Sequence, residues 1–146
     1  MKRLQRLVQA TEYFNEFRLE GATCSIVVDQ DNAISVLANA SGDQLLKSLP
    51  EESESGRTTD DWSGRLSVAM FAIAKINGPA RTPELARATY ARLLTLAQAA
   101  VAKLSDDMTA GGCRMLAGIS LTGLNVVPEY SIFGGWSGYS IELTLD

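Results

Sequence analysis

Acidic residues are the ones in this chain whose type and spacing could support chemistry. Three pairs of aspartates lie close together in the sequence: Asp29 with Asp31, Asp60 with Asp61, and Asp106 with Asp107. Such pairs can hold a cation, but adjacent side chains of a helix or strand point apart. The first pair also lacks the glycine and the terminal glutamate of an EF-hand loop. We therefore interpret the pairs as turn or cap residues, with metal binding as the alternative, and predict no metal site.

Nucleophilic catalysis would lack its usual partners. The chain has no histidine, so neither a Ser-His nor a Cys-His arrangement can form. The glycine-rich segments 111–112 and 134–138 lack the lysine of a phosphate-binding loop. Cys24 and Cys113 form no CxxC motif, and we expect buried free thiols; a disulfide would need Cα atoms within about 7 Å. We predict no catalytic residue, no cofactor and no enzyme, with a Lys- or Asp-assisted enzyme as the alternative.

Composition predicts one globular domain spanning residues 1–146. Hydrophobic residues make up 46% of the chain and charged residues 21%, with a formal net charge of -4. This balance gives no overall attraction for nucleic acid. Lys2, Arg3 and Arg6 form the best basic strip, but acidic residues follow, so we interpret it as a solvated helix face rather than a nucleic-acid site. The sequence also lacks a signal peptide and an apolar run of about 18 residues, which predicts a protein without a membrane segment that stays in the cytoplasm.

Two helices must position these side chains. Residues 3–18 place their apolar side chains on one stripe. A longer helix is predicted from Pro83 to about Leu104, because Thr82 can cap it and proline suits its first turn.

Strands and loops fill the rest of the chain. An apolar run on both sides of 65–76 predicts a strand that is either central in the sheet or covered on both faces. Residues 50–61 have no apolar side chain apart from proline and are predicted to be a mobile loop. The other expected elements are a strand at 22–28, a turn at 29–32, a second hairpin strand at 33–37 and a short helix at 43–49.

The C-terminal residues predict a β-hairpin. Strand-like segments 126–133 and 136–146 are separated by Gly134-Gly135, a two-residue turn. That turn places 133 opposite 136, 130 opposite 139, and 126 opposite 143. One face then collects Tyr130, Tyr139 and Ile141, and the other collects polar residues that include Glu142. Pro128 lacks an N–H group, so the strand 126–133 should be an edge strand or end at a bulge.

These elements predict an α+β fold: an antiparallel sheet with two helices packed on it and a closing hairpin. The arrangement resembles the tail terminator, or tail-completion, proteins of long-tailed bacteriophages. The residues that carry the resemblance are 61–68 (DWSGRLSV), which enter the central strand, the 82–104 helix, 124–129 (LNVVPE) and 138–143 (GYSIEL).

The resemblance implies a structural virion protein. Members of this family form a ring, here expected to be a hexamer, that caps the tail tube, ends tail assembly and joins the tail to the head. The implied partners are other copies of the chain, the tail tube protein and the head–tail connector, and the implied location is the host cytoplasm and then the virion tail. Other head–tail connectors or tail subunits, and a non-viral small-molecule or protein-binding module, are the alternatives.

Five residues are candidates for subunit contacts. Pro128 and Glu129 lie on the expected edge strand, and Glu142 lies on the polar face of the hairpin. Trp62 and Trp136 stand beside polar loops and could anchor an interface, because aromatic residues are enriched at binding hot spots. Closing the ends of the core is the equal alternative for both tryptophans.

Overall fold

The computed structural model describes residues 2–55, 63–76, 82–109, 116 and 118–146. Within these residues it contains three helices and six strands. In chain order they are α1 (Lys2–Glu16), β1 (Thr23–Val27), α2 (Gln30–Leu37), β2 (Gln44–Ser48), β3 (Glu51–Ser55), β4 (Ser63–Lys75), α3 (Pro83–Met108), β5 (Leu121–Ile132) and β6 (Trp136–Leu145). None of the described helices combines the length and the apolar character needed to cross a membrane.

The six strands form one sheet, and the α+β prediction is confirmed. The strand order is β1-β2-β4-β6-β5, and β3 pairs with β4 off this path. All pairs are antiparallel except β1 with β2, which are joined by the crossover helix α2. The predicted central strand is β4, which pairs with β2, β3 and β6.

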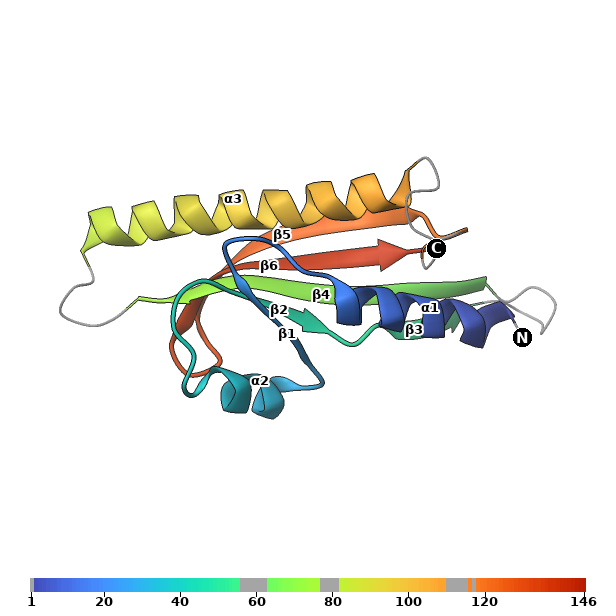
Figure 1. Ribbon diagram of the computed structural model, residues 1–146, viewed down its shortest axis with the longest axis horizontal. Helices are drawn as coiled ribbons and strands as arrows, with labels where there is room; N and C mark the ends of the chain where they lie inside the picture. Colours follow the sequence, from blue (N-terminus) through green and yellow to red (C-terminus); the bar gives the residue numbers. More distant parts are fainter. Residues whose placement is uncertain (1, 56–62, 77–81, 110–115, 117) are drawn as a thin grey trace.

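Two helices cover one side of the sheet, which we call the covered face. Figure 1 shows α3 running along the sheet, and α1 packs on the same side through a shared core. Thr82 caps α3 as predicted, accepting the Leu85 N–H at 3.1 Å. The core side chains of this face are fully or almost fully buried and include Phe14, Phe17, Met70, Leu104, Ile141 and Leu143.

A third, shorter helix packs on the opposite side, which we call the open face. α2 has only eight residues and buries Ala33 and Leu37 against a smaller core. Val27, Leu46, Ile73 and Trp136 complete this core. β4 is apolar on both faces, as its sequence predicts: α1 and α3 cover one face, and α2 covers part of the other.

The predicted turn at 29–32 and hairpin strand at 33–37 are wrong, because these residues begin and form α2. Asp29 is the N-cap, and its Oδ1 accepts the Asn32 N–H at 2.7 Å. Asn32 in turn accepts the Val28 N–H at 3.0 Å through its Oδ1. Side-chain bonds to backbone N–H groups at this position are typical of the start of a helix. The cap interpretation of Asp29 is therefore confirmed.

The predictions for 43–49 and 50–61 are also wrong where the structure describes these residues. Gln44–Ser48 is strand β2, and its central position in the sheet outweighs local preference. Glu51–Ser55 is strand β3, which pairs with Ser63–Ser67 of β4 although it contains no apolar residue. Between the two strands the Ser48 hydroxyl accepts the Ala69 N–H at 2.8 Å, which satisfies the backbone where direct pairing stops. Residues 56–61 lie outside the described residues.

Candidate functional site: an open strand edge and an acidic cleft

β5 is an edge strand of the sheet, as Pro128 predicts. Pro128 lies opposite Tyr139. Proline has no N–H to donate, so this pair must be a non-hydrogen-bonded pair of the ladder. Leu124 and Val126 are in the same phase of the strand, so their N–H groups point away from β6. A row of backbone groups is therefore free to pair with another strand.

Apolar side chains stand beside this row of backbone groups. Leu124, Val126 and Tyr130 are 48%, 37% and 67% exposed, although they belong to the covered face. They remain exposed because α3 packs over β4 and β6 rather than over β5. The helix reaches β5 through Tyr90, whose hydroxyl donates to the Glu129 carbonyl at 2.6 Å. The β5 edge thus combines open backbone with exposed apolar surface.

The predicted register of the hairpin is wrong by two residues. Pro128, and not Tyr130, lies opposite Tyr139, and Val126 lies opposite Ile141. Two local features cause the shift: a bulge between Glu129 and Ile132, where Ser131 has a φ of 53°, and a loop that includes Phe133 at φ 51°. A shift of two residues keeps every side chain on its face, so the predicted apolar and polar faces are retained.

The loop of the hairpin is three residues long because Phe133 leaves the strand. Its ring packs edge-to-face on Phe71, with centroids 5.0 Å apart and planes at 85°. The Gly135 N–H donates to the Ile132 carbonyl at 3.1 Å and closes the turn. The aromatic contact holds the turn over the open face of the sheet.

The other candidate contact residues lie in different places. The Glu129 carboxylate accepts the Ser140 hydroxyl at 3.0 Å, and Glu142 is exposed on the open face. Trp136 is only 2% exposed and packs in the smaller core, which favours the core interpretation of this residue. Trp62 and Cys113 lie outside the described residues. Cys24 is a free, half-buried thiol.

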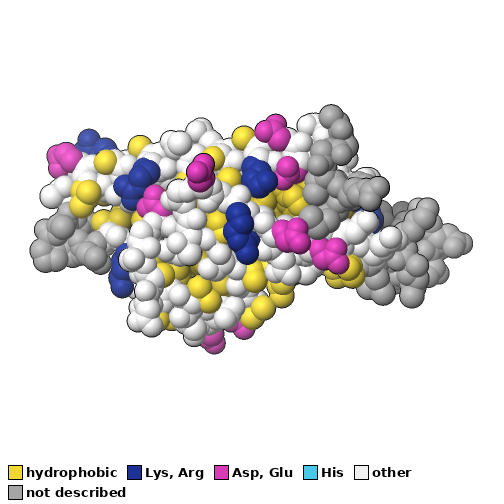
Figure 2. Space-filling view, viewed as in Figure 1, with side chains coloured by type: hydrophobic (Ala, Val, Ile, Leu, Met, Phe, Trp, Pro, Cys, Tyr) yellow, Lys and Arg dark blue, Asp and Glu magenta, His cyan; other side chains and the backbone are white. Residues whose placement is uncertain are grey.

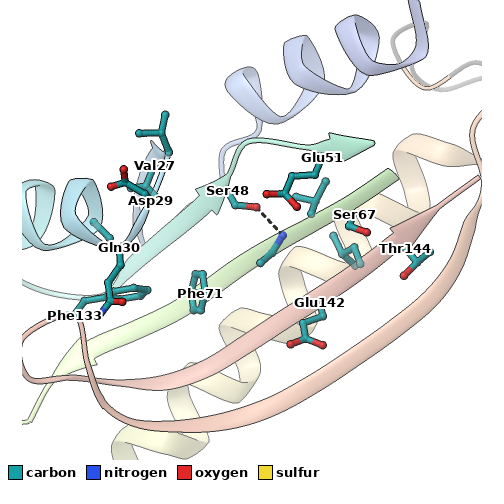
Figure 3. A pocket seen from close by; sticks show the side chains of 15 residues that line it. Val27, Asp29, Gln30, Ser48, Glu51, Ser67, Phe71, Phe133, Glu142 and Thr144 are labelled. Atoms are coloured by element: carbon teal, nitrogen blue, oxygen red, sulfur yellow. Dashed lines mark hydrogen bonds between the residues drawn. The ribbon is translucent and has the colours of Figure 1, made fainter. Parts of the chain in front are cut away.

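A cleft of about 450 Å³ lies on the open face and was not predicted from the sequence. Its floor is formed by β4, its walls by α2, β3 and the hairpin turn, and Glu142 of β6 borders it (Figure 3). Its lining includes three acidic residues and three apolar ones: Asp29, Glu51 and Glu142, and Ala69, Phe71 and Phe133. The sequence signal for this surface was the apolar set Ala69, Phe71 and Ile73 on the second side of β4. Alternation shows that this side is apolar but does not show that it is uncovered.

A buried lysine lies elsewhere, on the covered face. Lys47 is fully buried, and its Nζ donates to the Phe17 carbonyl at 2.8 Å. Burial, together with the nearby positive charge of Arg18, lowers the pKa of Lys47 to about 8, although the Cys24 thiol acts in the opposite direction. The amine joins the end of α1 to β2 and does not line the cleft.

Comparison with known proteins assigns no family to this chain. No protein-family model matches the sequence, and no curated protein matches it with significance.

Proposed function

We propose that this protein is a non-catalytic assembly subunit that joins other copies of itself through the β5 edge. The observation that carries the proposal is a long outer strand whose apolar side chains and outward N–H groups are both exposed. By its resemblance, the assembly is a hexameric ring that caps a bacteriophage tail tube, ends tail assembly and joins the tail to the head. Its partners are then the tail tube protein and the head–tail connector.

The composition of the edge supports this proposal. Exposed edge strands are usually protected by charged residues, proline or bulges. Here Pro128 and the bulge at 130–131 protect the C-terminal part of β5, and a second irregularity between Leu121 and Gly123 interrupts its N-terminal end. The segment Gly123–Val127 between them contains no charged residue. An unprotected, apolar strand edge of this length favours pairing with a strand of another chain.

The opposite edge of the sheet offers the second surface that a ring needs. β1 is the other end strand, and Val28, which follows it, is 64% exposed. Hydrophobic side chains gather over α2 in Figure 2, where Ile34 and Val36 are exposed, while charges of both signs are interspersed on the rest of this view. Two different surfaces on opposite edges give a head-to-tail contact, and such contacts form a ring when the rotation between neighbouring subunits closes. A β5–β5 contact would instead give a two-fold dimer.

The experiment is light scattering at micromolar concentration on the full chain and three variants. Val126→Pro removes an outward N–H and leaves the ladder to β6 intact, so we expect a folded monomer where the unaltered protein forms rings or ring fragments. Val126→Ala keeps the N–H and should assemble more strongly than the proline variant. Val127→Pro removes an N–H that faces β6 and should lose about 1 kcal/mol or more of folding stability.

Two results would count against this proposal. A wild-type chain that stays strictly monomeric at high concentration would favour a binding module without a ring. A Val126→Pro protein that assembles like wild type would show that strand pairing at β5 is not the contact.

A further inference from the structure

The open face of the sheet is hollow because α2 is too short to cover it. The eight residues of α2 lie over one end of the sheet, whereas the covered face carries helices of 15 and 26 residues. Beyond α2 no other described helix covers this face, and the elements around it enclose the cleft of about 450 Å³. Sites that hold ligands have volumes of about 300–1,000 Å³. The cleft therefore has room for a few side chains of a bound partner.

The floor of this cleft is apolar. Ala69 and Phe71 project from β4, and Phe133 leans on Phe71 from the hairpin turn. Figure 3 shows Phe71 in the middle of the cleft and Phe133 at its α2 end. Both rings are only partly buried. Covering them would remove apolar surface from water, at about 25 cal/mol per Å².

The rim of the cleft is acidic. Asp29, Glu51 and Glu142 line it, and the described residues of its lining include no lysine or arginine. None of the three carboxylates forms an ion pair with a described residue. They come from three different elements and lie on different sides of the floor (Figure 3). Like charges around a concave, partly apolar surface concentrate a negative potential.

We propose that this cleft is a docking site for a basic amphipathic segment of another protein. An apolar side chain of the segment covers Phe71 and Phe133, and its lysine or arginine side chains reach Glu51 and Glu142. A segment fits better than a small cation because the carboxylates surround the floor instead of converging on one point. The cleft is lined by no β5 residue, so this site and the assembly edge are separate.

The test is an NMR titration of the full-length Val126→Pro protein, which keeps the outcome independent of assembly through β5. The probe is a short amphipathic peptide of leucine, alanine and lysine, and its matched control carries glutamate in place of lysine. We expect the lysine peptide to shift the amide signals of Ala69, Phe71 and Thr144, and the glutamate peptide to leave them unchanged.

Charge-neutral variants locate the contact. The lysine peptide should bind Glu51→Gln/Glu142→Gln at least about tenfold more weakly than it binds the parent protein, because two ion pairs are lost. The control variant Glu12→Gln/Glu20→Gln removes the same amount of negative charge at exposed sites away from the cleft. Its affinity for the lysine peptide should stay within about twofold of that of the parent protein.

Four results would overturn this proposal. They are equal binding of the glutamate peptide, equal binding by both double variants, amide shifts spread over the whole surface, and butylammonium binding as tightly as the lysine peptide, which would indicate a small-cation site. A separate light-scattering measurement on Glu51→Gln/Glu142→Gln, made without the proline substitution, tests whether the cleft binds a second copy of this chain. Dissociation of an oligomer there would make the cleft a self-contact and would also contradict the proposal.

Discussion

The two faces of the sheet differ sharply although the same strands form both. Along β6, Ile141 and Leu143 are at most 2% exposed beneath α1 and α3, while Glu142 between them is exposed at the cleft. Alternation along one strand thus sends one residue into the core and the next to the surface. The larger core therefore lies on the covered face, whereas part of the open face and the β5 edge are left uncovered by the described helices.

The largest expected effect comes from a charge placed in the covered face. Ile141→Asp buries a carboxylate among apolar side chains and should destabilise the protein by roughly 3 kcal/mol or more. Urea denaturation measures the loss. Glu142→Gln, the next residue, is the matched control and should change stability by less than about 0.5 kcal/mol. A critical Glu142 with a tolerant Ile141 would reverse the assignment of the two faces.

A smaller effect is expected at Lys47, the charged residue inside the covered face. Lys47→Met removes an amine whose charged form is disfavoured by burial, while the Phe17 carbonyl still accepts a hydrogen bond from Arg18 at 2.8 Å. We expect this variant to be more stable at pH 7 by about 1–2 kcal/mol. A clear loss of stability would show that the bond from Lys47 to Phe17 outweighs the cost of burying the charge.

The titration of Lys47 should make folding stability depend on pH. Its folded pKa of about 8 lies below the ordinary value of 10.5, so the unfolded chain binds more protons between these two values. The contribution of Lys47 to folding stability should therefore rise as pH increases from about 8 to 10.5. Urea denaturation across this range should show the rise in wild type, and Lys47→Met should lack it. Parallel curves for the two proteins would contradict the lowered pKa.

The long, regular elements could be predicted from sequence because local pattern and burial agree there. The Thr82 cap and the apolar stripe predicted α3, and apolar residues on both sides predicted the central strand β4. Pro128 identified an edge strand by chemistry alone, since its missing N–H excludes an inner position. Each of these signals acts within one element.

The missed elements depend on contacts between distant residues. Ala33–Leu37 is a short apolar run, which periodicity alone cannot assign to helix or strand. β3 has no apolar side chain and is a strand because β4 extends beside it. The position of Phe133 depends on Phe71, 62 positions earlier in the sequence. The cleft could not be predicted for the same reason, because it is a space that other elements leave uncovered.

Amide hydrogen exchange at β5 tests the central claim, assembly through its open edge, most directly. The N–H groups of Leu124 and Val126 point away from β6, while that of Val127 faces it. In a dilute, monomeric sample Leu124 and Val126 should exchange quickly and Val127 slowly. When the sample is concentrated and the molecular mass of the particle increases, exchange at Leu124 and Val126 should slow by about tenfold or more. Val127 should be protected at every concentration. Fast exchange at both residues in a fully assembled sample would contradict the account.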